Sequence, residues 1–494
     1  MVLILGRKAL DFIRSDLGMR FLAEAAARCT GFVVTPLISW VLGAAVFGSY
    51  TQILSLSFAF VPIVSAGLGY TVIRQVASRV DSHGDPGVLV FSIGLISVLC
   101  SALALAMFVF ADFIAGFVSL GFPVSPLSLA LAVSVLAWMT SVEALIQEYF
   151  RALKLVKQSL QVQLVSIFLH LALLLAFTFA GHLSIWSAIG VLIFAKMLVN
   201  GFVLARTILY GGKERKDQLK MPGLRVLVSG VPFMLSGLAE WAGNLGDRLV
   251  VGKYLGAETV AHYTAAMMLL SVIAALGAPL WWLLFPEIVR ERARGNSEGC
   301  ARIVQSRTMV FVWLAFPALT LICVIANPAI SLLVNAHSLD MVLVVLVLGM
   351  AMIINQLATG WEYYVVSATS GKQLMVATMA CALIGFGGAV LFAPLYGILG
   401  VALGLLCGKM LFALVCAGLA RRYGFPGTVV NGPKTALLAI ASVLVYFLVS
   451  TILGYFGSLG DIAQVVSASC LVAMIFAAGY LACYRKKLAD QFGK

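Results

Sequence analysis

The chain has 494 residues, of which 62% are hydrophobic and only 11% are charged, and its formal net charge at pH 7 is +13. This composition excludes a soluble enzyme, a disordered chain and an outer-membrane barrel, whose strands alternate apolar and polar residues. The sequence predicts an all-α polytopic membrane protein, because each membrane-crossing helix requires roughly 20 apolar residues.

Apolar runs of spanning length follow one another along almost the whole chain, after a charged N-terminal cytoplasmic segment, 1–19, that is predicted to lie on the membrane as a short amphipathic helix. No loop between the runs is long enough to form a separate domain. We expect about fourteen transmembrane helices, at residues 20–44, 51–76, 87–111, 126–149, 160–180, 184–208, 226–249, 259–287, 307–327, 341–365, 374–394, 396–420, 435–455 and 463–484.

The basic residues indicate the orientation of these spans. Of the 33 Lys and Arg residues, 28 fall in the termini and in one set of loops, which is typical of the cytoplasmic side. The opposite set of loops has only Arg248 and Lys253. An even number of spans with both termini in the cytoplasm accounts for this split. Most of the positive charge is therefore explained by the orientation of the chain in the membrane. No basic soluble face remains that could bind a nucleic acid.

The two halves of the chain resemble each other at an offset near 213 residues. Leu42–Ala44 matches Leu255–Ala257, Glu148–Phe150 matches Glu362–Tyr364, and the Lys-Met-Leu that begins at Lys196 matches the one at Lys409. Six spans separate equivalent points, so the repeats share one orientation. This predicts two parallel-repeat six-helix bundles with a substrate site between them near the midplane. The expected division is 20–210 and 226–422 for the bundles, 211–225 for a basic linker, and 423–494 for two additional helices with a tail.

No catalytic constellation is present in the sequence. There is no P-loop and no His-x3-His pair. The five His residues are scattered, and only His170 lies deep in a span, where a lone His is usually a hydrogen-bonded core residue. The acidic residues between Asp81 and Asp85 sit in a short polar turn. We expect no enzyme activity, no metal and no cofactor.

Two segments carry a family resemblance. Leu42–Tyr50, followed by a span that ends at Ala66–Arg74, resembles the start of the Wzx-type polysaccharide flippases, members of the multidrug/oligosaccharidyl-lipid/polysaccharide exporter superfamily. Asp247–Tyr263 is similar to that family's junction between spans 7 and 8, and Pro286–Arg290 fits the end of span 8. One departure is Ala261, where the family usually has Gly. The resemblance covers most of residues 20–420.

The resemblance implies two six-helix bundles around a central cavity and an alternating-access cycle. It implies transfer of undecaprenyl-diphosphate-linked oligosaccharide from the cytoplasmic to the periplasmic leaflet of a bacterial inner membrane, for O-antigen, capsule or exopolysaccharide. The partners it implies are membrane lipids, a polysaccharide polymerase and chain-length proteins. The sugar, the coupling ion and the polymer pathway stay open.

Three cations fall inside predicted spans. Lys196 and Lys409 lie about 12 residues from either end, or roughly 18 Å of helix, farther than a lysine side chain can reach by snorkelling. Each is therefore expected to face a wet cavity or an acidic partner. Arg28 has Glu24 one turn away as a partner. We expect these cations, together with Arg248 at the outer end of span 7, to bind the diphosphate; the alternative is that they form internal ion pairs.

Acidic residues inside or at the ends of spans are candidates for ion coupling or gating. Asp247 adjoins Arg248, and Glu240 lies seven residues earlier, about two helical turns, so both acids could share one hydrated path. The alternative is that Asp247 only neutralises a snorkelling Arg248. Glu148 and Glu362 end spans 4 and 10, where they either brace the following loops, which we favour, or form a cytoplasmic gate. Glu24 belongs to the same set.

Two other functions remain possible from the sequence. An ion-coupled multidrug exporter of the same superfamily would need an acidic and aromatic cavity, to which Glu24, Glu240, Asp247 and Glu362 could contribute. The intramembrane lysines and the two extra spans argue against it. A lipid-modifying enzyme or a scaffold would need a clustered His/Asp site at one leaflet, and the sequence has none.

Overall fold

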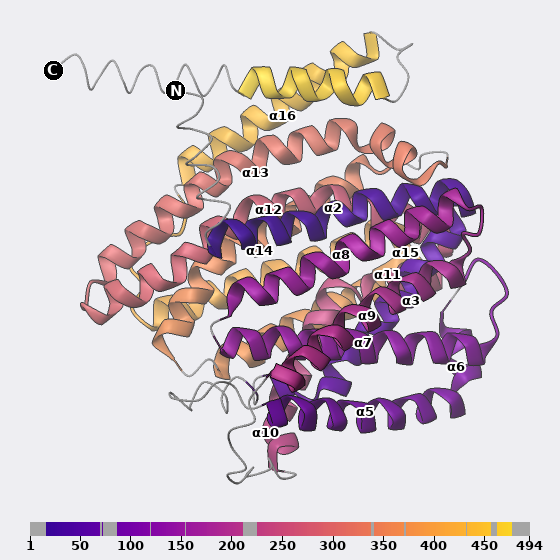
Figure 1. Ribbon diagram of the computed structural model, residues 1–494. Helices are drawn as coiled ribbons and strands as arrows, with labels where there is room; N and C mark the ends of the chain where they lie inside the picture. The colour runs from indigo at the N-terminus through magenta and orange to yellow at the C-terminus, as the bar shows by residue number, and fades with distance from the viewer. Residues whose placement is uncertain are drawn as a thin grey trace, which may run out of the picture. The chain divides into compact units, whose positions relative to one another are not determined.

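In the computed structural model, the protein is built from helices over the described residues, which are 16–69, 72, 86–118, 120–153, 155–210, 225–336, 340–369, 372–430, 432–455 and 462–476. Within these ranges, side chains are described from residue 26 onward, except at 86, 117, 156, 210, 225–229, 282–283 and 454–455. Most of the N-terminal segment 1–19, the turn at 81–85 and the basic linker lie outside these ranges. Figure 1 shows the helices in chain order.

The chain forms two compact units, residues 1–264 and 265–494. The division falls inside one long helix, so the expected bundle boundaries at 210 and 226 stay predictions. The first unit contains α2 (Asp16–Leu42), α3 (Ala44–Ser65), α5 (Pro86–Val109), α6 (Ala111–Phe117), α7 (Pro126–Ala152), α8 (Val156–Phe179), α9 (Ile185–Tyr210), α10 (Arg225–Asn244), α11 (Asp247–Leu255) and the start of α12 (Ala257–Ala293).

The second unit contains the rest of α12 and the C-terminal helices. These are α13 (Ser297–Val334), α14 (Val342–Ala368), α15 (Lys372–Arg422), α16 (Gly432–Tyr455) and a last helix at 462–476. Within the described ranges, 10 helices are long and apolar enough to cross a membrane. Each expected span contains helix in its described part, which confirms the all-α polytopic fold.

Two boundaries differ from the predicted spans. The expected span 226–249 is two helices, because α10 ends at Asn244 and α11 begins at Asp247. The expected spans 374–394 and 396–420 run together as α15, with a sharp change of direction at Gly397, where φ is +59°. Only a residue without a Cβ adopts such a φ without strain. Hydropathy averages over a window and does not report these local changes.

The repeat is visible in the backbone at the Leu-Gly-Ala motif. Gly43 has φ +92° and ψ 159°, and its counterpart Gly256 has φ +87° and ψ 166°. The hydrogen bonds match as well: the Gly43 N–H donates to Ser39 O at 2.9 Å, and the Gly256 N–H donates to Gly252 O at 3.1 Å. The same turn therefore joins two helices at both places, as the internal repeat predicts.

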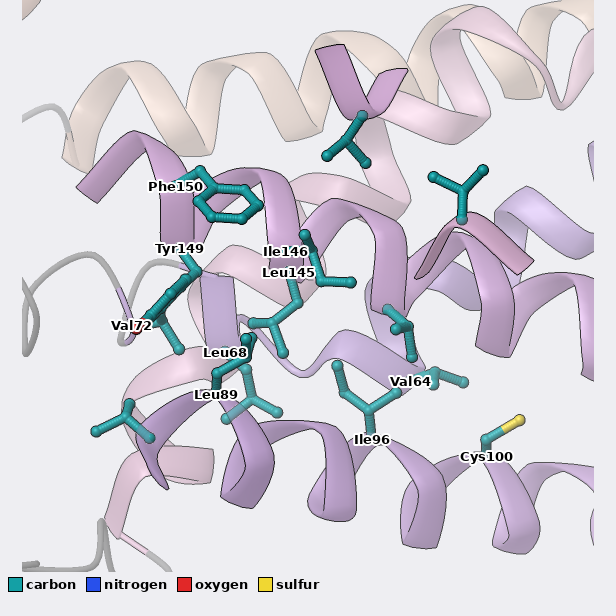
Figure 2. Packing of buried hydrophobic residues seen from close by; sticks show 14 residues of the cluster. Val64, Leu68, Val72, Leu89, Ile96, Cys100, Leu145, Ile146, Tyr149 and Phe150 are labelled. Atoms are coloured by element: carbon teal, nitrogen blue, oxygen red, sulfur yellow. The ribbon is translucent and has the colours of Figure 1, made fainter. Parts of the chain in front are cut away.

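An apolar core of the first unit lies where α3, α5 and α7 pack together. Figure 2 shows Leu89 and Ile96 of α5 below the α7 residues Leu145, Ile146 and Tyr149. Each of these side chains is at most 2% exposed. α7 therefore lies in the interior of the unit, and a polar residue on it requires a partner.

A close seam joins α3 to α10, α11 and the first residue of α12 within the first unit. A Cβ at Gly48 would lie 1.7 Å from the Ala257 carbonyl oxygen, and one at Gly230 would lie 1.9 Å from the Ala66 carbonyl oxygen. Between these two ends, the Ser55 hydroxyl donates to Leu245 O at 2.5 Å and the Trp241 indole donates to Ser55 O at 2.8 Å. The helices approach this closely because glycine has no side chain.

Small residues also bring the two arms of α15 together in the second unit. A Cβ at Gly408 would lie 2.7 Å from the Gly385 Cα, and one at Gly388 would lie 3.2 Å from the Gly404 Cα. The ridge Gly400-x3-Gly404-x3-Gly408 thus serves close helix packing, as expected from such spacing.

Candidate functional site

Lys196 and Glu143 form an ion pair inside the first unit. Lys196 lies near the middle of α9, and its ammonium donates to the carboxylate Oε2 of Glu143 on α7. The two side chains are only 15% and 11% exposed. A single charge at this depth would be very unfavourable, whereas the pair compensates both charges. Of the two surroundings expected for Lys196, the structure shows an acidic partner.

Two further polar groups lie near the ion pair. Asn200, one turn after Lys196, donates from Nδ2 to the Met139 carbonyl at 3.3 Å, one turn before Glu143. His170 of α8 is 6% exposed and interacts electrostatically with Lys196. It is buried as expected, but its Nε2 atom has no hydrogen-bond partner among the described residues. Because α7, α8 and α9 pack against one another, acid, amine and imidazole gather within one small region.

Asp247 is the first residue of α11 and is fully buried. The Tyr263 phenol donates to its Oδ2 atom at 2.6 Å, and the backbone N–H of Arg248 donates to Oδ1 at 2.8 Å. Tyr263 belongs to α12, so the carboxylate ties α11 to α12 across the turn at Gly256. This geometry favours a structural role for Asp247, and its role in ion coupling stays a prediction.

Arg248 and Glu240 differ in their surroundings from Asp247. The Arg248 side chain is 14% exposed, and its Nη1 atom lies 3.4 Å from the Asn244 carbonyl oxygen and 4.0 Å from Asp247 Oδ1. Glu240 is exposed on α10, whereas Asp247 is buried on α11. The spacing argument for a shared path assumed one continuous helix, and the chain instead turns at 245–246.

The two glutamates at equivalent positions of the repeat lie on different helices, Glu148 near the end of α7 and Glu362 on α14. Glu148 bonds to Arg151 three residues later, with 3.1 Å between Oε1 and Nη1. Its side chain also lies against Gly69, where an added Cβ would be 3.3 Å from the Glu148 Cγ. These contacts agree with the favoured bracing role at the end of α7. Glu362 is half-buried on α14, and a gating role for either residue stays a prediction.

The other predicted cations are half-buried on separate helices. Arg28 lies on α2, which packs against α3 and α8, and Lys409 lies on α15. Glu24 belongs to α2, but its side chain is outside the described part of the chain. The structure brings Lys196 together with Glu143 and Arg248 together with Asp247, while the diphosphate site expected from Arg28, Lys196 and Lys409 stays a prediction.

Sequence reasoning missed two participants, Glu143 and Tyr263. A carboxylate well inside a predicted span is a signal for a buried partner, and Glu143 carried that signal at position 18 of the expected span 126–149. Tyr263 closes the Asp247–Tyr263 motif, but nothing in the sequence indicated its bond to Asp247, because a phenol in an apolar run resembles an ordinary core aromatic. Among the described residues, no group of three or more His, Cys, Asp or Glu could hold a metal ion.

Comparison with solved structures shows which known fold the protein has. The fold is similar to that of the lipid II flippase MurJ in an inward closed conformation, with a TM-score of 0.71 at 13% identity over 94% of this chain and 98% of that one. It is also similar to an inward-facing multidrug resistance MATE transporter of the MOP superfamily (TM-score 0.60, 15% identity, 84% and 95% covered). A MATE transporter of Vibrio cholerae gives a TM-score of 0.59 at 16% identity, with 84% and 97% covered. The fold is that of MOP-superfamily transporters.

A family model narrows this class. The model described as "Polysaccharide biosynthesis protein" matches residues 15–291, more than half of the chain. The protein therefore belongs to the polysaccharide biosynthesis protein family, and the resemblance read from the sequence motifs is confirmed. A comparison with curated proteins finds no match.

Proposed function

We propose that the protein is a flippase that moves undecaprenyl-diphosphate-linked oligosaccharide from the cytoplasmic to the periplasmic leaflet of a bacterial inner membrane, by alternating access, for polysaccharide biosynthesis. The observation that carries this proposal is the family match over residues 15–291. The likeness of the fold to a lipid II flippase supports it, because that protein also handles a lipid-linked substrate.

The chemistry of the substrate agrees with the charged groups of the chain. The sugar hydroxyls and the diphosphate would lose their water in hydrocarbon, which is very costly without a polar path. Cations inside the membrane would offset the diphosphate charge, and Arg28, Lys196 and Lys409 are the candidates. Since Lys196 already bonds to Glu143, a diphosphate that used Lys196 would replace or share this carboxylate.

The membrane potential, negative inside, favours outward movement of an anion. It supplies about 2.3 kcal/mol per charge per 100 mV. A flippase for an anionic lipid therefore gains direction from the potential alone, and no nucleotide hydrolysis is required.

A second candidate is an ion-coupled multidrug exporter. The specific observation in its favour is the likeness of the fold to MATE transporters, and Asp247 is a fully buried carboxylate. The bonds from Tyr263 and the Arg248 backbone to this carboxylate argue against it, because they leave fewer lone pairs for a cationic drug.

Reconstitution of the full-length protein in proteoliposomes tests both functions. One set of vesicles carries a fluorescent undecaprenyl-diphosphate-linked oligosaccharide, and the other contains a cationic dye. Movement of the glycan lipid but not of the dye supports the flippase. Movement of the dye alone overturns the proposal in favour of the exporter.

A further inference from the structure

The tip of the hairpin formed by α12 and α13 lies beyond the hydrocarbon layer. The helices have 37 and 38 residues, so each is about 55 Å long, against roughly 30 Å of hydrocarbon. All charged residues of the hairpin except Glu258 lie between Glu287 and Arg307, where the helices join. The charged end of the hairpin therefore extends out of the hydrocarbon and through the layer of lipid headgroups, where phosphate groups lie.

Two arginines of the hairpin tip have acidic partners. Arg294 bonds to Glu291 with 2.8 Å between Nη1 and Oε1, and Arg307 bonds to Glu287 with 3.0 Å between Nη2 and Oε1. The second oxygen of Glu291 accepts a 2.8 Å hydrogen bond from Asn296. Both carboxylates are thus already engaged.

Arg292 differs from these neighbours. Its guanidinium carbon lies 4.7 Å from the ring centroid of Tyr364 on α14. Its Nη1 atom is buried, and none of the described residues forms a hydrogen bond with this atom or an ion pair with Arg292. An arginine that serves only to place positive charge at the headgroups can stay hydrated, as Arg294 does with a side chain 72% exposed. A buried donor without an acceptor is instead costly and indicates a missing acceptor.

The aromatic platform under Arg292 is fixed in place. Tyr364 is only 2% exposed, and its hydroxyl donates to the Tyr423 carbonyl at 3.3 Å. The Phe425 ring, 4% exposed, packs edge-on against it with centroids 4.9 Å apart. The guanidinium is therefore held over a fixed ring, which reduces the entropy lost when it binds a ligand.

We propose that Arg292 is a phosphate-binding site at headgroup level, in which the guanidinium held over the Tyr364 ring donates its Nη1–H to an oxygen of a lipid-borne phosphate. Guanidinium groups match phosphate oxygens in geometry and charge, and a charge-assisted bond would satisfy the buried donor. The phosphate could belong to the diphosphate of a lipid-linked glycan, a source that rests on the proposed function. It could equally belong to the headgroup of an anionic phospholipid, which does not depend on that function.

Native mass spectrometry of the full-length protein tests the site with three probes: undecaprenyl diphosphate, phosphatidylglycerol and phosphatidylcholine. Arg292→Gln is compared with Arg290→Gln, a matched control that removes the same charge from an exposed position two residues away. We expect Arg292→Gln to weaken binding of at least one anionic lipid by about ten-fold, and Arg290→Gln to change it less than about two-fold. Phosphatidylcholine should be unaffected by either.

The pattern of loss identifies the source of the phosphate. Loss of phosphatidylglycerol alone assigns a phospholipid headgroup, and loss of undecaprenyl diphosphate alone assigns the glycan lipid. Equal loss in both variants, or no loss in either, overturns the site. If Arg292→Gln fails to fold, Arg292→Lys keeps the charge without the planar fork, and undiminished binding in that variant also overturns it.

The site and the proposed function can fail separately. Arg292-dependent binding of phosphatidylglycerol in a protein that moves no glycan lipid would leave the site standing and remove the function. The opposite result is transport of the glycan lipid by the protein while Arg292→Gln leaves the binding of both anionic lipids unchanged. That result would support the function and overturn the site.

Discussion

Replacement of Lys196 by Gln removes one half of a buried ion pair and leaves the Glu143 carboxylate alone on α7. We expect the free energy of unfolding to fall by about 3–5 kcal/mol, because an uncompensated buried charge is strongly destabilising. Thermal unfolding of the purified protein in detergent measures this. The double variant Glu143→Gln, Lys196→Gln should recover most of the loss, since no charge remains. A double variant as unstable as the single one would contradict the ion-pair account.

Substitution of Lys196 together with Lys409 tests whether the two lysines take part in transport. If Lys196 and Lys409 bind the diphosphate, the double variant Lys196→Gln, Lys409→Gln should lose glycan-lipid transport in proteoliposomes at equal protein level. The Glu143→Gln, Lys196→Gln variant provides a folded control that retains Lys409. Full activity in the Lys196→Gln, Lys409→Gln protein would remove both lysines from the mechanism.

Substitutions of Asp247 and Tyr263 distinguish a structural role of the Asp247 carboxylate from a role in ion coupling. Tyr263→Phe removes the donor to Asp247, and we expect a loss of stability of about 1.5–3 kcal/mol, the usual contribution of a hydrogen bond to a charged group. Asp247→Asn should destabilise the protein by a similar amount and leave the pH profile of transport unchanged. A changed pH profile in Asp247→Asn alone would show that the carboxylate has a coupling role.

At the level of residues, the sequence predicted which charges need partners but not which partners they have. The depth of Lys196 in its span was enough to require a cavity or an acid. The acid is 53 residues earlier in the chain, and the rotation of α7 and α9 about their axes decides whether the two meet. Rotation depends on packing over whole helices, which no single-sequence pattern reports.

Among the elements, the seam between α3 and α10–α11 gives a sharp prediction. Gly48→Ala or Gly230→Ala places a Cβ within 2 Å of a backbone carbonyl oxygen, so we expect each to lower the melting temperature clearly, by the equivalent of about 1–3 kcal/mol of overpacking. The control is Gly190→Ala on α9, where an added Cβ meets nothing within 4 Å. That change should be neutral or slightly stabilising, since alanine favours helix. Equal melting temperatures in all three variants would contradict the seam.

The helices themselves were largely predictable, because apolar runs of spanning length occupy a lipid layer only as helices. Their local breaks were not. The chain turns at 245–246 within an apolar run, where Ser55 of α3 donates to the Leu245 carbonyl, and this contact comes from a helix remote in sequence. The Gly43 and Gly256 turns are the exception, because the repeated Leu-Gly-Ala motif marked both.

For the whole molecule, the distribution of basic residues predicts cytoplasmic termini and an even number of spans. Reporter fusions after residue 153 or 295 should therefore read cytoplasmic, and fusions after residue 118 or 335 should read periplasmic. All four positions lie at or next to helix ends. A cytoplasmic signal at 335 together with a periplasmic C-terminus would contradict this topology.

The ion pair between α7 and α9 also constrains how the protein is made. Glu143 leaves the ribosome 53 residues before Lys196, so α7 reaches the insertion machinery with a charge that nothing yet neutralises. A charged side chain at the centre of a lone inserting helix costs about 2.5–3.5 kcal/mol. This cost is removed only when α9 arrives, with α8 between them, so release of α7 into lipid becomes more favourable at that point. The biosynthetic unit of this region is therefore the three-helix group, and nascent chains that stop before α9 should be retained at the insertion site.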